Sequence, residues 1–244
     1  MPEGPEVWIL SEAINKFYHC EKTRAYGKHL FVFPPFIKVE PNTNTNTDTN
    51  TNTNFGSTFL KGGCGLNWSF GLTGKIQITD DNTMIKLNSG WIYGDQIEFH
   101  DYDEETRKLG TNWLTSSAAD LHKIVDRWIK SKKKLAGLIL DQTKISGIGV
   151  AWGSEILALA NLVPEKKCCE QDLSTLVSAL TTIRDKIHNL YLNTLHKIAV
   201  NKVDLKTFIN DWFKNLYNIR EMKVYKKGQQ IKVGGRTWYK NESN

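Results

Sequence analysis

The sequence predicts an α+β fold in which an N-terminal helix and an antiparallel β-sandwich domain precede a helical domain and a C-terminal β-hairpin. Three observations support this prediction: helical spacing of apolar residues at the start, short alternating segments between turn residues up to about residue 97, and renewed helical spacing from residue 121. We place the domains at 1–118, 119–222 and 223–244. A chain of 244 residues with 40% hydrophobic residues is long enough to bury a core.

The first segment is expected to form a helix over residues 5–18. Pro5 suits the first turn of a helix. Glu3 and Glu6 would then lie favourably at the positive end of the helix. The apolar residues that recur at helical spacing are Val7, Leu10, Ile14 and Phe17.

Strands are expected after this helix. Residues 29–33 form an apolar run that ends at Pro34 and Pro35. Residues 42–54 are a run of Asn and Thr with one Asp and no apolar residue, which predicts a disordered surface loop. The alternating segments that follow, separated by Gly, Asn and Asp, predict an antiparallel β domain and cover residues 66–70, 75–78, 84–87 and 91–93.

The second half changes to helical spacing. Asp172 and Asp204 are expected to cap the fourth and fifth helices, and a Gly-containing turn at 146–149 joins the second helix to the third. At the end, a Gly234-Gly235 turn separates two strands of a hairpin. The expected helices run through residues 121–129, 135–139, 155–159, 173–187 and 204–212, and the expected strands are 224–225, 230–233 and 237–239.

Charge is distributed unevenly along the chain. Residues 1–120 carry 10 Lys and Arg against 15 Asp and Glu, whereas residues 121–244 carry 22 against 11. This asymmetry favours a C-terminal half that contacts phosphates. The four cysteines, Cys20, Cys64, Cys168 and Cys169, lack the paired spacing of a zinc site or a disulfide framework, so we expect neither a metal nor a cofactor.

The chain also lacks the marks of a membrane protein. Its start has no basic leader segment, and no stretch reaches the roughly 18 apolar residues of a spanning helix. We expect an intracellular monomer without a membrane partner.

The pair Pro2-Glu3 is the strongest candidate for chemistry. Removal of Met1 would expose the secondary amine of Pro2. An α-amine has a pKa of about 8, so a substantial fraction is neutral at physiological pH and can attack a sugar C1′ to form a Schiff base. Glu3 could transfer the protons. Taken alone, the tripeptide is better explained as the beginning of a helix than as a catalytic terminus.

Further segments give this start a context. The opening M-P-E-G-P-E, the segment Gly27-Lys28-His29-Leu30, residues 140–157 and residues 234–239 occur in the order found in one known family. The chain resembles the formamidopyrimidine-DNA glycosylase and endonuclease VIII family. Gly4 makes it more similar to the endonuclease VIII branch.

The resemblance implies a catalytic role for four residues. Pro2 would be the nucleophile and Glu3 the general acid and base. Glu6 would be a supporting carboxylate, and Lys28, on a strand, would contact the phosphate beside the lesion.

The resemblance also implies a DNA-binding surface. The turn from Lys144 to Gly149 would belong to a helix-two-turn-helix motif in which Gly147 and Gly149 let the backbone approach a phosphate. Arg236 would be the phosphate-binding arginine of a finger that lacks zinc, because residues 223–244 contain no cysteine. Leu72 would fill the space left by the extruded base.

Together these residues imply a bifunctional DNA glycosylase and AP lyase of base-excision repair. It would act on damaged duplex or single-stranded DNA and favour oxidised pyrimidines. The sequence departs from the family pattern at Val150, where the family has Asn, and in the short spacing between Pro2 and Lys28. These departures leave open a non-catalytic relative that only binds damaged DNA, and an RNA-binding module built on the helical turn is a third alternative.

Overall fold

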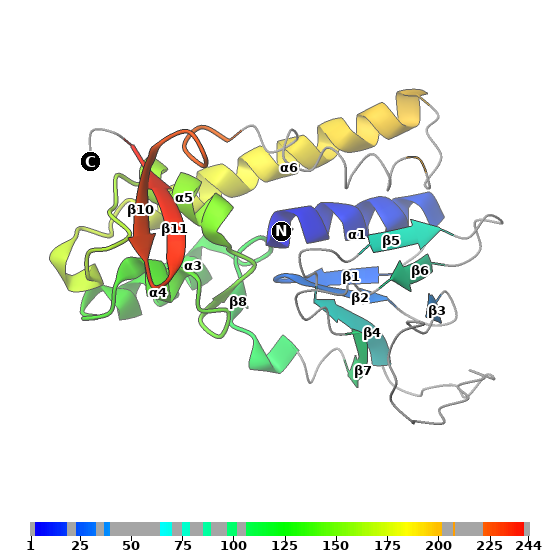
Figure 1. Ribbon diagram of the computed structural model, residues 1–244, viewed down its shortest axis with the longest axis horizontal. Helices are drawn as coiled ribbons and strands as arrows, with labels where there is room; N and C mark the ends of the chain where they lie inside the picture. The colour runs from blue at the N-terminus through cyan, green and yellow to red at the C-terminus, as the bar shows by residue number, and fades with distance from the viewer. Residues whose placement is uncertain are drawn as a thin grey trace.

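Two lobes make up the molecule, and the helix α6 reaches from one to the other (Figure 1). This computed structural model describes residues 3–18, 23–32, 37–39, 64–69, 75–78, 85–88, 97–101, 106–201, 207 and 222–241. Helix α6, Leu176–Asn201, begins among the helices of the C-terminal lobe and passes over α1, Gly4–Tyr18, of the N-terminal lobe. The rings of Trp8 on α1 and His188 on α6 lie 5.0 Å apart, centroid to centroid.

The N-terminal lobe combines α1 with two sheets. Most of α1 is buried, and the helix packs against β1 and β2; Val7, Leu10 and Ile14, which recur at helical spacing, are among its buried residues. The strands are β1 Thr23–Tyr26, β2 His29–Val32, β4 Cys64–Ser69 and β7 Ile97–Asp101 in a four-stranded sheet of order β1-β2-β4-β7, and β3 Ile37–Val39, β6 Ile85–Asn88 and β5 Lys75–Ile78 in a three-stranded sheet of order β3-β6-β5.

The strand directions correct the expectation of an antiparallel domain in one place. The four-stranded sheet is antiparallel throughout, but β3 pairs with β6 in parallel, with Ile37 opposite Ile85. A parallel pair needs a long crossover, and the 45 residues between Val39 and Ile85 are ample for one. Strands β1, β3 and β7 were not predicted.

Helices dominate the C-terminal lobe. Helix α3 follows the prediction closely, because its buried residues Leu121, Ile124, Val125 and Trp128 are those at helical spacing. The Ser117 hydroxyl caps it by accepting the Asp120 N–H at 3.2 Å. The helices before α6 are α3 Ala118–Ile129, α4 Leu135–Ile139, α5 Val150–Leu159 and the 3₁₀ helix η1 Cys168–Glu170, and a short parallel pair joins β8 Thr111–Asn112 to β9 Ile145–Ser146.

Helix α5 supports the C-terminal hairpin. Strands β10, Gln229–Val233, and β11, Arg236–Lys240, pair in antiparallel fashion across Gly234 and Gly235, which have φ values of +58° and +73°. The side chain of Trp238 is fully buried on α5, where a Cβ added to Gly153 would lie 3.1 Å from its ring. The hairpin therefore gains its stability by docking on α5.

Two local predictions were wrong. The helix expected to begin at Asp172 begins at Leu176, because the Asp172 carboxylate closes a tight turn by accepting the Ser174 N–H at 2.9 Å. Residues 224–225, expected as a strand, form a turn. The Asn/Thr run at 42–54, the segment 91–93 and nearly all of the helix expected at 204–212 lie outside the described residues, and the domain boundaries remain predictions.

No helix within the described ranges is long and apolar enough to cross a membrane. The same ranges contain no group of three or more His, Cys, Asp or Glu side chains placed to hold a metal ion.

Candidate active site at the start of helix α5

The carboxylate of Glu3 is bound to the N-terminus of α5. It accepts three backbone N–H groups, from Gly149 at 3.1 Å, Ala151 at 2.9 Å and Trp152 at 3.1 Å. The side chain is only 6% exposed. The first N–H groups of a helix have no partner within the helix and carry partial positive charge, so this position stabilises a negative charge on Glu3.

Glu6 orients the backbone of Glu3. One Glu6 oxygen, Oε2, accepts the Glu3 N–H at 2.7 Å, and the other, Oε1, accepts the indole N–H of Trp152 at 2.8 Å. Trp152 thus touches both carboxylates, one through its backbone and one through its ring. Glu3 is thereby fixed to α5 in two ways: its carboxylate binds the helix amides, and its N–H binds Glu6, which in turn binds Trp152.

Two glycines permit this close approach. The Gly4 N–H donates to the Gly147 carbonyl at 2.8 Å, and a Cβ added to Gly4 would lie 2.6 Å from the Cα of Gly147. A Cβ added to Gly149 would lie 2.2 Å from the carboxyl carbon of Glu3. A side chain at Gly4 would require movement of the backbone, and one at Gly149 would require movement of the Glu3 carboxylate or of the helix start.

The structure gives Gly147 and Gly149 a different immediate role from the one expected. The Gly149 N–H is bound by Glu3, and the Gly147 N–H is bound by the side chain of Gln142 at 2.9 Å. Among the described residues, the Val150 N–H is the one amide of this helix start for which the structure gives no acceptor. Any direct amide contact to a phosphate here therefore falls to Val150, whose side chain supplies no polar group.

Gln142, which lies within the 140–157 segment and was not predicted to have a role, holds the turn before α5. Its amide N–H groups donate to the carbonyls of Leu140 and Ile148, both at 3.0 Å, while its oxygen accepts from Gly147. One side chain thus closes the whole turn. In the sequence, the indication of this role was a Gln a few residues before a glycine-containing turn. That pattern is too common to assign a role.

Lys28 lies beside the two carboxylates, in the turn between β1 and β2 and not within a strand as expected. Burial lowers the pKa of its amine, the positive charge of Arg236 lowers it further, and the charges of Glu3 and Glu6 oppose the shift. Four predicted residues from distant parts of the chain therefore share one electrostatic environment.

Arg236 and Lys144 flank this centre. Arg236 is exposed at the start of β11 and lines a cavity of about 360 Å³ between α4 and the hairpin, together with Lys134, Gly137 and Asp141. Lys144 is exposed at the turn before α5. Pro2 and Leu72, the predicted nucleophile and wedge, lie outside the described residues.

Comparison with known proteins gives this geometry a context. No family model matches the chain. A formamidopyrimidine-DNA glycosylase from Mycoplasma pneumoniae is 35% identical over an alignment of 100 residues, and the match covers 33% of this chain and 35% of that protein. The match thus spans about a third of the length of this curated relative.

Solved structures match over nearly the whole chain. A complex of wild-type Lactococcus lactis Fpg (MutM) with DNA containing an oxidised pyrimidine has a TM-score of 0.54 at 16% identity and covers 99% of this chain and 98% of that chain. The fold is that of Fpg (MutM). The complex of Lactococcus lactis Fpg with DNA containing an abasic site gives the same TM-score of 0.54 at 16% identity, again over 99% and 98% of the two chains. The Fpg fold is mixed α/β, which agrees with the α+β class expected from the sequence.

Proposed function

We propose that this protein is a DNA glycosylase of base-excision repair that removes oxidised bases and cleaves the resulting abasic site through a Schiff base on Pro2. The observation that carries the proposal is the clamping of Glu3, the residue after Pro2, by α5 and Glu6. Through this anchor the residue beside Pro2 shares one electrostatic environment with Lys28 and Arg236.

The chemistry needs an amine, a carboxylate and a cation in one place. The secondary amine of Pro2 attacks C1′ of an extruded nucleotide, the C1′–base bond breaks, and the base leaves with a proton. The C1′–O4′ bond of the sugar ring then breaks as O4′ takes up a proton, which gives a ring-opened iminium between Pro2 and C1′. This iminium makes the C2′ proton acidic. Its removal expels the 3′ phosphate, and Glu3 transfers the protons.

Lys28 and Arg236 supply the positive charge. In the proposed complex Lys28 contacts the phosphate beside the lesion, and this contact stabilises the charged form of an amine whose pKa burial lowers. Arg236 contacts a second phosphate from the hairpin, which acts as a finger without zinc. Lys144 and the Val150 N–H complete the phosphate contacts of the helix-two-turn-helix motif.

A preference for oxidised pyrimidines is the finer part of the proposal. It rests on the resemblance of Gly4 to the endonuclease VIII branch. Packing also explains a glycine at this position, because an added Cβ would clash with Gly147. Fpg from Lactococcus lactis has been crystallised both with an oxidised pyrimidine and with N7-benzyl-Fapy-dG, so the fold accommodates both classes of base in that protein.

Borohydride trapping on duplex DNA with an abasic site tests the function. Wild-type protein should form a covalent adduct, and mass spectrometry of that adduct should place the linkage on Pro2 with Met1 absent. Pro2→Gly together with Glu3→Gln should abolish trapping, whereas Glu170→Gln, a change of the same kind at an exposed carboxylate, should not affect it. Lack of an adduct with wild-type protein, or undiminished trapping by the double variant, would refute the proposal.

A non-catalytic relative is the second candidate, and Val150 favours it because its side chain offers no hydrogen-bond donor at the helix start. This candidate predicts duplex binding that weakens steeply with salt but gives no adduct in the same assay.

A further inference from the structure

Two lysine-rich segments far apart in the sequence lie side by side at the end of the C-terminal lobe. Their backbones are hydrogen-bonded, because the Cys168 N–H donates to the Lys133 carbonyl at 3.1 Å and the Leu135 N–H donates to the Lys166 carbonyl at 3.0 Å. Lys134 and Lys167 form an isolated antiparallel bridge between them. We call the exposed side chains of these segments the lysine band: Lys130, Lys132, Lys133, Lys134, Lys166 and Lys167.

Little negative charge compensates the band. Within the described part of the chain, Lys167 is the member that forms an ion pair, with Glu170 at 3.0 Å, and this carboxylate raises the pKa of Lys167. Asp141 faces Lys133, whose charge helps to lower the pKa of the Asp141 carboxyl. The backbone pairing requires only N–H and C=O groups, so the fold does not explain why six side chains are lysine.

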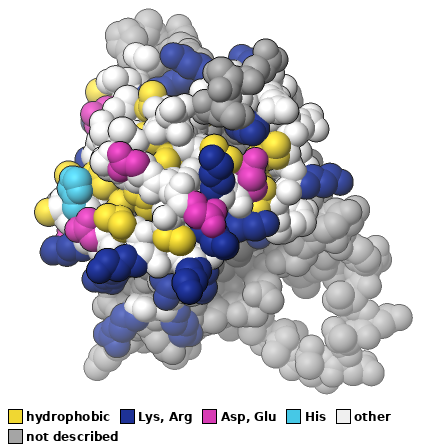
Figure 2. All heavy atoms as spheres, turned by 90° about the vertical axis from the view of Figure 1, so that its left-hand side faces the viewer, with side chains coloured by type: hydrophobic (Ala, Val, Ile, Leu, Met, Phe, Trp, Pro, Cys, Tyr) yellow, Lys and Arg dark blue, Asp and Glu magenta, His cyan; other side chains and the backbone are white. Residues whose placement is uncertain are grey.

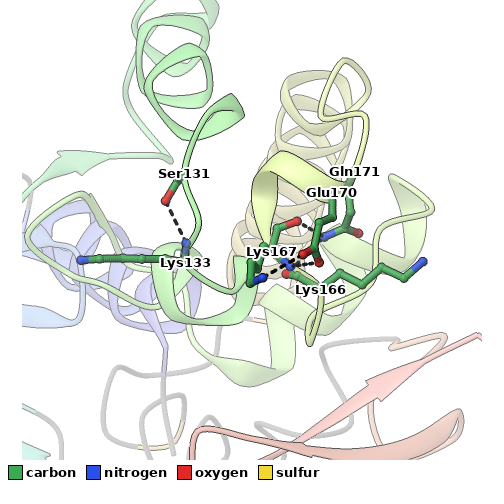
Figure 3. Close-up of polar contacts among 6 residues, drawn as sticks. All are labelled: Ser131, Lys133, Lys166, Lys167, Glu170 and Gln171. Atoms are coloured by element: carbon green, nitrogen blue, oxygen red, sulfur yellow. Dashed lines mark hydrogen bonds and ion pairs between the residues drawn. The ribbon is translucent and has the colours of Figure 1, made fainter.

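The shape of the band suits an extended polyanion. Figure 3 shows Lys133 and Lys166 extending in opposite directions from the paired segments, while Lys167 turns to Glu170. Figure 2, which views this end of the molecule, shows Lys and Arg side chains gathered along the lower part of the described surface. Ammonium groups that point apart cannot converge on one small anion, but they can contact successive phosphates of a strand.

The band is continuous with the proposed DNA surface. Lys134 and Arg236 line the same cavity between α4 and the hairpin. The positive charges of Lys133 and Lys144 both help to lower the pKa of the Asp141 carboxyl, so Asp141 lies near the band as well as near the turn before α5. A strand that contacts Arg236 or Lys144 therefore has the band next along the surface.

We propose that the lysine band binds backbone phosphates of undamaged duplex DNA outside the lesion and so extends the footprint of the enzyme. This inference rests on the proposed function for its choice of double-stranded DNA. The contacts carry no sequence information, because they engage phosphates alone. Their effect is to raise affinity and to hold the protein on long DNA.

Duplex length and salt provide the test. Binding is measured for duplexes of about 12 and about 30 base pairs that carry an uncleavable abasic-site analogue, over a series of salt concentrations. The band variant is Lys132→Gln with Lys133→Gln and Lys166→Gln. The control removes the same charge elsewhere, by Lys123→Gln with Lys186→Gln and Lys223→Gln.

Wild-type protein should bind the long duplex at least tenfold more tightly than the short one. In the band variant this ratio should fall towards one, and the slope of log affinity against log salt on the long duplex should fall by about 2 to 3, near 0.9 for each lost phosphate contact. The control should keep both the ratio and the slope.

Three results would overturn the inference. The first is an unchanged ratio of long-duplex to short-duplex affinity in the band variant, and the second is an equal fall of this ratio in the control. The third is a band variant that binds structured RNA more weakly than wild type but binds the long duplex equally well. Equal melting temperatures of the three proteins exclude unfolding as the cause. Borohydride trapping by wild-type protein on a short abasic duplex is scored separately, so that its failure identifies a failure of the proposed function and not of the band.

Discussion

Glu3 and Gly149 are separated by 146 residues, yet the Gly149 N–H donates to the Glu3 carboxylate at 3.1 Å. This bond and its neighbours join the first residues of the chain to the helix that also carries the C-terminal hairpin. One ten-residue helix, α5, thus positions both parts: its start holds the N-terminal lobe through Glu3, and its middle, at Gly153 and Ser154, holds the hairpin.

Gly149→Ala should displace Glu3. The added Cβ would lie 2.2 Å from the Glu3 carboxyl carbon, so either the carboxylate or the helix start must move. We expect a loss of about 1–3 kcal/mol in the free energy of unfolding, measured in urea, and a more than tenfold slower borohydride trapping rate. Gly137→Ala is the matched control. No atom lies within 4 Å of a Cβ at that position in α4, so it should stabilise the protein by about 0.5–1 kcal/mol and leave trapping unchanged.

Glu155→Ala should loosen the hairpin. The buried Glu155 carboxylate accepts the N–H groups of Lys223, Val224 and Tyr225 at 3.0, 2.6 and 2.8 Å. Its removal leaves these amides without an acceptor and should cost about 3 kcal/mol, with faster trypsin cleavage in the turn before β10. Glu155→Gln retains one acceptor oxygen and should lose less stability than Glu155→Ala. Glu170→Ala, at an exposed ion pair, should cost less than about 1 kcal/mol, and an equal effect of Glu170 and Glu155 would contradict this role.

Gln142→Leu should open the turn before α5. The Gly147 N–H would lose its acceptor, at a cost of about 1–3 kcal/mol, and the Gly147 carbonyl that holds Gly4 would move with it. Trapping should slow more than tenfold. Gln171→Leu offers a control with the same architecture, because Gln171 bonds both the N–H and the carbonyl of Val163 in a loop outside the site. It should cost similar stability without an effect on trapping, and equal slowing by both variants would indicate a general loss of folding.

Lys28→Met should change how stability depends on pH. Burial lowers the pKa of Lys28 in the folded protein, so the charged amine opposes folding below that pKa, and this penalty disappears as the pH rises through the lowered pKa to the ordinary value near 10.5. The variant should therefore be more stable than wild type at neutral pH, by about 1.4 kcal/mol for each tenfold change in the ionisation constant, and the difference should shrink as the pH rises towards 10.5. Urea unfolding of both proteins from pH 7 to 10.5 measures this difference in stability. A difference that grows with pH would contradict the stated cause, and trapping by the variant should be impaired at every pH.

Much of the fold was predictable from local pattern. Helices α1, α3 and α4 agree with the apolar spacing to within a few residues, because an amphipathic helix that buries one face must repeat apolar residues every three or four positions. The hairpin was predictable from Gly234-Gly235, since a tight turn with positive φ strongly favours glycine. Residues 224–225 were misjudged as a strand because their β-forming side chains say nothing of a carboxylate that binds their amides from another helix.

The sequence by itself determined which segments are helical or turning, because composition and spacing are local properties, and its resemblance to a known family indicated which residues are candidates for chemistry. Only the tertiary structure decided what those residues do for one another: that Glu3 is held by α5, that Gly149 is small to admit it, and that two lysine segments combine into one surface. The physical reason is that these relationships depend on backbone N–H and C=O groups, which every residue carries and which leave no mark in the sequence until folding brings distant segments together.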